Sequence, residues 1–172
     1  MRKPSHRTAR AERSTTDSQT MHPFAESLAN QNLDNLLACL SAEVTYHSPV
    51  MRNPVRGALV PDILAILLDT VDDLTVHAEF GDSDTKVLLC GFSMQGVRGE
   101  AAWVLRLDGT GKIRTVAWQA RPFAMSVRLS ESFGHGLAQR RGGPFPAIVS
   151  AGRAPARLVA RMVDLLAPHL VN

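Results

Sequence analysis

The chain has 172 residues and a formal net charge of +3, with 45% hydrophobic and 20% charged residues. This length is sufficient for one domain with its own apolar core, without support from disulfides or metals. The longest wholly apolar run, Ile63–Leu68, is far shorter than the ~18 residues of a membrane-spanning helix, and no secretory signal follows the basic N-terminus. We therefore predict a soluble, cytoplasmic protein.

The positive charge is concentrated at the two ends of the chain. Residues 1–20 carry a net charge of +3 and residues 134–172 one of +4, so residues 21–133 carry a net charge of −4. Basic ends can contact nucleic acid or anionic lipid, but no aromatic residues are interleaved with these charges. We expect solvated ends and no specific nucleic-acid partner.

The sequence indicates neither a metal nor a nucleotide cofactor. Cys39 and Cys90 are far apart and lie in apolar runs, so we expect buried, reduced thiols. Gly111-Lys112 lacks the following Ser or Thr of a phosphate-binding loop, because Ile113 occupies that position. His77 and Glu79 are expected on one strand face, but two such residues do not make a metal site.

The first part of the chain predicts a leader and a helical segment. Residues 1–20 are rich in Ser, Thr and Arg without apolar periodicity, which is typical of a disordered leader. Pro23 suits a first helical turn, and apolar residues recur at helical spacing from Phe24 to Leu40. We expect a break in this helix near the polar run Asn30-Gln31-Asn32.

A strand over 44–48 is expected to follow, because its side chains alternate in type and Pro49 ends it. Tyr46 and Ser48 point to one side of this strand, and His47 points to the other. After a loop, a second helix is expected to begin at Pro61.

From residue 74 onwards the apolar period changes to two. Glycine-bearing turns separate the expected strands, which cover 74–80, 86–92, 97–107 and 112–121. A short helix over 123–133, a loose segment and a final helix over about 154–167 complete the chain. Helices followed by a run of strands predict an α+β fold, with helices packed on one face of a curved antiparallel sheet.

Arginine is regularly spaced in the final predicted helix, at Arg153, Arg157 and Arg161. Such a stripe is usually a solvated face, and a role in binding a partner is the alternative.

Three landmarks, in this order, resemble a known superfamily. They are Asn32–Leu37 leading into Val44–Val50, a loop with Gly57 before the second helix, and Val104–Ile113 followed by Arg121-Pro122. Over about residues 21–133 they resemble the nuclear transport factor 2-like superfamily, and within it the SnoaL-like proteins and ketosteroid isomerases. The resemblance implies a cystatin-like α+β cone around an apolar pocket, and a homodimer formed through the open face of the sheet.

The catalytic residues of that family are not retained in this chain. Ketosteroid isomerases combine an Asp base with an oxyanion hole made of a Tyr and a neutral Asp. The base, which precedes the Pro of the first strand, is replaced by Ser48, and the oxyanion-binding Tyr and Asp are replaced by Phe24 and Trp103. Residues 112–123 also lack the acidic base of polyketide-cyclising members, so the resemblance does not imply standard ketosteroid isomerase activity.

His47 is the remaining candidate base, with an ordinary pKa near ~6.5, and Ser48 is a candidate hydrogen-bond donor beside it. The alternative for His47 is a structural hydrogen bond to a backbone carbonyl. A nucleophilic role for Ser48 would require an adjacent base, which the sequence does not indicate.

The predicted pocket lining consists of Phe24, Tyr46, Trp103 and Trp118, with core packing as the alternative role of the tryptophans. Arg52 and Arg56 are expected in the loop after the first strand, where they either flank the pocket mouth or are solvated. Gln119 and Arg121 have the opposite parity to Trp118 and are expected to face a dimer partner or solvent.

The sequence leaves two functions open. The first is binding of a small apolar metabolite, of polyketide or terpenoid type, with or without cofactor-independent acid–base isomerisation, cyclisation or hydrolysis. The second is a non-catalytic dimeric module for ligand binding or protein interaction.

Overall fold

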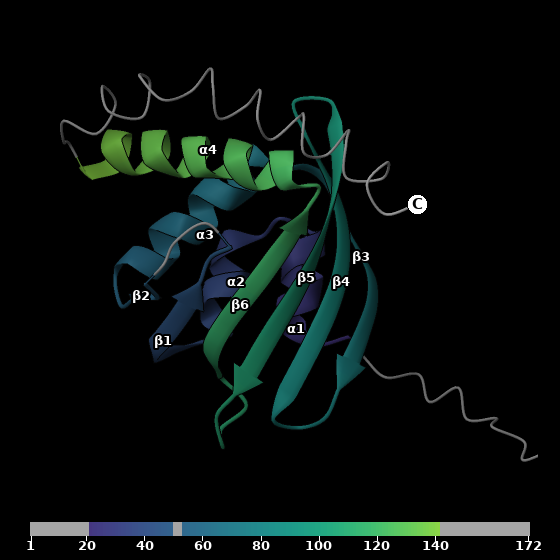
Figure 1. The fold of residues 1–172 in the computed structure, drawn as a ribbon. Helices are drawn as coiled ribbons and strands as arrows, with labels where there is room; N and C mark the ends of the chain where they lie inside the picture. The colour runs from purple at the N-terminus through teal and green to yellow at the C-terminus, as the bar shows by residue number, and fades with distance from the viewer. Residues whose placement is uncertain (1–20, 50–52, 142–172) are drawn as a thin grey trace, which may run out of the picture.

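The computed structural model describes residues 21–49 and 53–141, which form helices on one side of a curved sheet (Figure 1). The helices and strands, in chain order, are α1 (Pro23–Ala29), α2 (Leu33–Ala38), β1 (Leu40–His47), β2 (Val55–Arg56), α3 (Leu59–Thr70), β3 (Asp72–Gly81), β4 (Thr85–Met94), β5 (Val97–Leu107), β6 (Ile113–Arg121) and α4 (Phe123–Arg141). The predicted leader over 1–20 and the predicted helix over 154–167 lie outside the described residues. The predicted α+β class is confirmed.

The six strands form one open sheet in the order β2-β1-β6-β5-β4-β3. The pairs from β3 to β6 are antiparallel, as predicted, and so is β1 with β2. β1 and β6 are parallel, so the sheet is mixed rather than wholly antiparallel. This pairing joins strands that are distant in sequence, and no local pattern in the chain indicates its direction.

Polar residues between the first two helices separate them, as predicted. Asn32 begins α2, because its side-chain oxygen accepts a hydrogen bond from the backbone N–H of Asn35 at 3.0 Å. Gln31 has a φ of 51° and donates its side-chain N–H to the carbonyl of Val71 at 3.1 Å. The turn between α1 and α2 is therefore attached to the end of α3.

The strands from β3 to β6 agree with the predicted strands to within two residues at their ends. β1 begins at Leu40, which the helical pattern had placed in the preceding helix, and the two-residue β2 was not predicted. Two residues are too short a run to show a period of two, so β2 depends on its pairing with β1.

α4 is longer than the helix predicted over 123–133, and the prediction of a loose segment is wrong for residues 134–141. The helix lies across one end of the sheet and over α3 (Figure 1). Its buried side chains Met125, Leu129 and Phe133 join the main core. At Gly136 an added Cβ would lie 2.6 Å from an Ile66 side-chain carbon, so α3 and α4 are in close contact there.

One continuous apolar core lies between the helices and the inner face of the sheet. Its largest fully buried side chains include Trp103, Trp118, Tyr46 and Phe24. In the part of the chain that the structure describes, no helix is long and apolar enough to cross a membrane.

Candidate functional site

The four aromatic residues predicted to line a pocket form one cluster inside the sheet. Trp103 and Trp118 are directly paired across β5 and β6, and their rings are stacked with centroids 5.4 Å apart and planes 15° from parallel. Phe24 of α1 packs against Trp103 at a centroid distance of 6.0 Å. Each of the four side chains is at most 2% exposed. The predicted inward direction of both tryptophans is therefore confirmed.

The polar atoms of this aromatic cluster are paired with each other. The indole Nε1 of Trp118 donates a hydrogen bond to the phenol oxygen of Tyr46, and both groups are buried. Burial raises the pKa of Tyr46 well above its ordinary value, so the phenol stays neutral at physiological pH. The hydrogen bond satisfies two groups that would otherwise be costly to bury.

The described aromatic cluster contains no carboxylate that could act as a base. The buried polar or charged residues in the described part of the chain are Ser27, Ser126 and Glu131. Glu131 lies on α4 and lines a hollow of about 480 Å³ at the α3–α4 surface, together with Arg128 and His135. The described aromatic cluster thus offers apolar contact and the Tyr46–Trp118 pair, and none of these buried polar or charged residues is part of it.

The structure does not bring His47 together with the aromatic cluster. His47 is exposed and paired with Ala117 of β6, whereas its neighbour Tyr46 is fully buried. Neighbouring residues of a strand point to opposite faces, so His47 lies on the outer face of the sheet. Ser48 follows the end of β1 and is partly exposed. His47 and the aromatic cluster are therefore on different faces of the sheet.

The predicted pocket-mouth arginines are not both described. Arg52 lies outside the described residues, whereas Arg56 is exposed in β2, directly opposite Thr45 of β1. Gln119 and Arg121 are exposed, as their parity predicted. The Nε atom of Arg121 lies 2.6 Å from a carboxylate oxygen of Glu100 on the neighbouring strand.

His77 and Glu79 do not lie on the same face of β3, so this expectation is wrong. A register shift between Val76 and Ala78 places Glu79 opposite the buried Leu88, and its carboxylate accepts the backbone N–H of His22 at 2.8 Å. His77 instead lies over Gly91, where an added Cβ would be 2.6 Å from its Nε2. No group of three or more potential metal ligands occurs among the described side chains.

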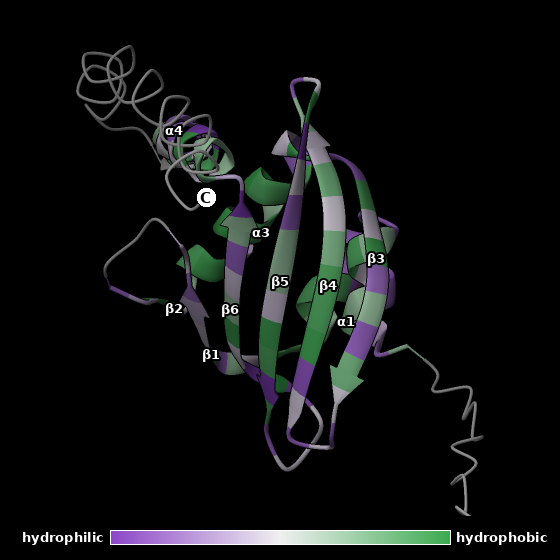
Figure 2. Ribbon diagram, turned by 45° about the vertical axis from the view of Figure 1, so that its right-hand side comes forward, coloured by the Kyte–Doolittle hydropathy of each residue, from purple (hydrophilic) through white to green (hydrophobic). Residues whose placement is uncertain are grey.

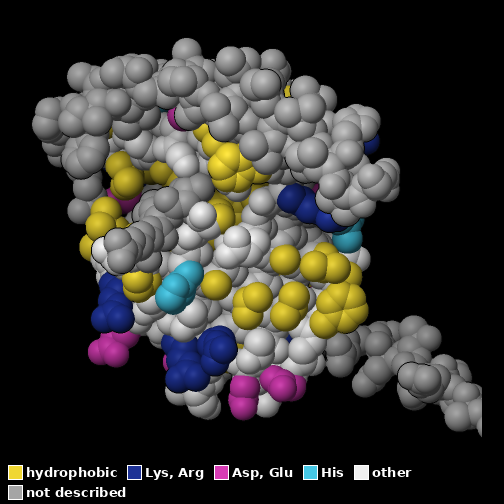
Figure 3. Space-filling model, viewed as in Figure 1, with side chains coloured by type: hydrophobic (Ala, Val, Ile, Leu, Met, Phe, Trp, Pro, Cys, Tyr) yellow, Lys and Arg dark blue, Asp and Glu magenta, His cyan; other side chains and the backbone are white. Residues whose placement is uncertain are grey.

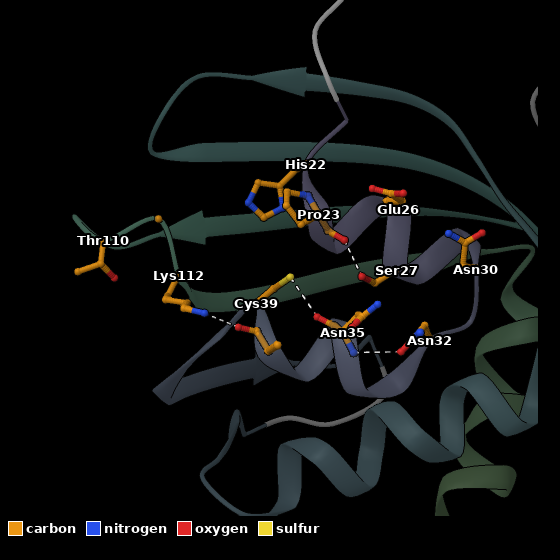
Figure 4. Close-up of a pocket in the computed structure, with 12 residues that line it drawn as sticks. His22, Pro23, Glu26, Ser27, Asn30, Asn32, Asn35, Cys39, Thr110 and Lys112 are labelled. Carbon is orange, nitrogen blue, oxygen red and sulfur yellow. Dashed lines mark hydrogen bonds between the residues drawn. The ribbon is translucent and has the colours of Figure 1, made fainter.

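A polar cavity of about 540 Å³ lies between α1, α2 and the β5–β6 turn (Figure 4), and no pattern in the sequence predicted it. Its lining includes the amides of Asn30, Asn32 and Asn35 and the side chains of Cys39 and Lys112. The Cys39 thiol donates to the carbonyl of Asn35 at 3.3 Å, and burial raises its pKa. A thiol with a raised pKa is a poor nucleophile, so this cavity does not resemble a catalytic cysteine site.

The outer face of the sheet carries an apolar band that crosses four strands. One row of paired residues runs from Phe80 through Val87 and Val104 to Ala117. Next to it, Leu89 is paired with Ala102. Phe80 is 57% exposed and Leu89 is 41% exposed. We call these six residues the apolar band, and Figure 3 shows hydrophobic side chains gathered on this face.

Comparison with known proteins supports the fold. No protein-family model matches the chain, and no curated protein sequence matches it significantly. A steroid delta-isomerase from Pseudomonas aeruginosa matches with a TM-score of 0.62 and 23% identity, over 69% of this chain and 88% of that chain. A protein with a cystatin-like fold from Silicibacter pomeroyi matches with a TM-score of 0.63 and 17% identity, over 68% and 86% of the two chains.

A de novo designed protein with a curved β-sheet also matches, with a TM-score of 0.54 and 16% identity, over 64% of this chain and 88% of the design. At such identities the likeness is one of fold. The chain therefore has an α+β fold with a curved sheet, shared with this steroid delta-isomerase and this cystatin-like protein.

Proposed function

We propose that the protein is a non-catalytic binding module that acts as a homodimer, with the outer face of its sheet as the interface. The observation that carries this proposal is the apolar band, in which Phe80 and Leu89 expose large apolar side chains. The helices of the described chain lie behind the sheet or across its end (Figure 2). A contiguous exposed apolar patch commonly marks an interaction site.

The arrangement of this face favours a second copy as the partner. On β5 the outward residues run from Glu100 through Ala102 and Val104 to Arg106, so the apolar part is central and the ends are charged. A two-fold axis through the centre of such a face places one apolar band on the other and charged rims at both ends. Isologous dimers require this kind of self-complementary patch.

The size of the face fits a stable dimer. The four strands β3 to β6, about 4.8 Å apart, give a width of roughly 14 Å between the outer two, and about ten residues at about 3.3 Å each give a length of roughly 33 Å. The resulting area is of the same order as the ~800 Å² that each partner contributes to a standard interface.

Sedimentation velocity of the full chain tests this proposal. We expect a dimer for the wild type, and a dissociation constant at least about thirtyfold higher for Leu89→Glu, because a buried charge replaces an interface anchor. Met21→Glu is the matched control, since Met21 is 44% exposed and Leu89 41%. A monomeric wild type, or equal effects of the two variants, would contradict the proposal.

The non-catalytic part of the proposal rests on the packed aromatic cluster. The positions equivalent to the isomerase catalytic residues are Ser48, Phe24 and Trp103, and the last two are fully buried in aromatic contacts. His47 lies on the other face of the sheet. A proton acceptor there cannot reach a molecule held against Trp118.

Binding of a small apolar metabolite inside the cone is the second candidate function. It is favoured by the stacked Trp103–Trp118 pair, together with a fold shared with a steroid delta-isomerase. A ligand between these rings would change their fluorescence, and Trp118→Ala would reduce the response. Absence of a response to a panel of steroids, polyketides and terpenoids would exclude this candidate for those classes.

The same panel tests the predicted catalytic residues. If a panel compound is turned over, unchanged turnover in His47→Ala would show that His47 is not the base, and Ser48→Ala tests the predicted hydrogen-bond donor in the same way. Dimerisation is measured separately on each variant, so that a change in association is not mistaken for a change in chemistry.

A further inference from the structure

The parallel pairing of β1 and β6 is interrupted near its start. Leu40 is paired with Ile113, and the next pair is Thr45 with Thr115. Four residues of β1, Ser41 to Val44, thus lie opposite the single residue Arg114. An insertion of this size bends one strand away from its neighbour, as smaller bulges do.

A hollow of about 880 Å³ lies on the outer face of the sheet at this interruption. Its lining combines cationic and hydroxyl side chains with an imidazole and two carboxylates. The residues that line it are Ser41, Ala42, Glu43, Thr45, His47, Arg106, Asp108, Arg114 and Thr115. The hollow includes His47, for which the interior of the cone offers no role.

Arg106 and Arg114 form no ion pair within 4.0 Å among the described residues, and the charge of Arg114 acts on Asp108 only at longer range, where it helps to lower the pKa of that carboxyl. Arg121 and Arg140, by contrast, form ion pairs with neighbouring carboxylates. Arg56 adds a third cation beside the hollow, because it is paired with Thr45. Paired residues of adjacent strands lie on the same face of a sheet.

The two carboxylates of the hollow differ in their surroundings. One oxygen of Asp108 accepts the backbone N–H groups of Thr110 at 2.8 Å and Lys112 at 3.0 Å. The Thr110 hydroxyl, these backbone hydrogen bonds and, least, the charge of Arg114 lower the pKa of Asp108, and the hydrogen bonds hold its carboxylate on the turn. Glu43 is exposed and has no such contacts in the described structure.

We propose that this hollow binds an oxyanion, the phosphate or carboxylate group of a ligand, between Arg106 and Arg114. Guanidinium groups bind such oxyanions through charge-assisted, often paired hydrogen bonds. The Thr45 and Thr115 hydroxyls lie in the same hollow as further donors. The Ser41 hydroxyl is buried without a hydrogen-bond partner in the described structure, and a bound oxygen would supply an acceptor.

Titration of the full chain with inorganic phosphate and with succinate, followed by NMR, tests this site and distinguishes the two anions. We expect shifts of the Thr45 and Thr115 amide signals for at least one anion, and weaker binding at higher ionic strength. Arg106→Gln and Arg114→Gln should each weaken binding by at least about fivefold. Glu43→Gln should strengthen it, because one negative charge is removed from the hollow.

Arg98→Gln is the matched control, because Arg98 is exposed on the same strand as Arg106 but outside the hollow. No saturable shift with either anion, or equal weakening by Arg98→Gln, would overturn the proposal. The hollow lies on the face proposed as the dimer interface, so the titration is repeated on Leu89→Glu, which is expected to leave that face free. If that variant is monomeric and still binds an anion, the anion site is supported whether or not the wild type forms a dimer.

Discussion

The indole of Trp118 on β6 donates its hydrogen bond to the phenol oxygen of Tyr46 on β1, and these two strands pair in parallel. Both side chains are at most 1% exposed. The pair therefore combines the largest apolar surfaces of the core with a satisfied polar contact.

Tyr46→Phe should lower the free energy of unfolding by about 1–3 kcal/mol, because the buried N–H of Trp118 loses its acceptor. Chemical denaturation of wild type and variant measures this difference. In a Trp118→Phe background the same change should cost less than about 0.5 kcal/mol, since no indole donor remains. Equal costs in both backgrounds would show that the hydrogen bond contributes nothing.

The buried thiol of Cys90 predicts a loss of stability at alkaline pH. Burial raises the pKa of this thiol to about 12, above the ordinary value of 9.0. The folded protein therefore keeps a proton that the unfolded chain releases, so this contribution is complete below pH 9 and is lost as the pH rises towards 12.

Through the Cys90 thiol alone, the free energy of unfolding should fall by at most about 1.4 kcal/mol per pH unit. Unfolding measured between pH 7 and pH 10.5 should show a shallower decline for Cys90→Ala than for the wild type. Cys39→Ala is the comparison, because Cys39 is partly exposed and its thiol has a charged lysine nearby. If the free energy of unfolding declined equally with pH in the wild type and in Cys90→Ala, the loss of stability could not be attributed to the Cys90 thiol.

The contact between α3 and α4 can be tested at Gly136. In Gly136→Ala the new methyl group would lie 2.6–2.9 Å from three side-chain carbons of Ile66. We expect a net destabilisation of about 1–2 kcal/mol, because the overlap exceeds the gain in helix propensity. Thermal unfolding of Gly136→Ala with Ile66→Val should show partial recovery, and no recovery would locate the strain elsewhere.

Arg121 should contribute little to stability despite its ion pair. The side chains of Arg121 and Glu100 are 79% and 59% exposed, respectively. Exposed pairs contribute about 0–1 kcal/mol, and salt weakens them. Arg121→Ala should therefore change the free energy of unfolding by less than about 0.5 kcal/mol in 0.5 M salt. A loss above about 2 kcal/mol would contradict this expectation and show a structural role of Arg121 beyond the exposed ion pair.

Much of the fold could be predicted from the sequence because its signals are local. The period of two between residues 74 and 121 correctly predicted four strands and the inward direction of Trp103 and Trp118. Asn32 and its polar neighbours correctly predicted the break between α1 and α2. Capping and alternation are properties of adjacent residues, so no knowledge of distant contacts is needed.

Features that depend on distant contacts could not be predicted in this way. The parallel β1–β6 pairing, its interruption opposite Arg114, and the two-residue β2 arise from tertiary packing. The continuation of α4 to Arg141 passes through Gly134 and Gly136, which weaken a local helix signal. For the same reason the hollow with Arg106 and Arg114 has no linear motif.

The β1–β6 pairing also bears on how the chain folds. Thr45 and Thr115 are paired across about 70 intervening positions, whereas β3 to β6 are joined by short turns. Closing a long loop before its contacts form is entropically costly, and a large share of distant contacts slows folding. We expect the β3–β6 meander to assemble first and β1 to dock late, so amides of β1 should gain protection from hydrogen exchange after those of β4 and β5.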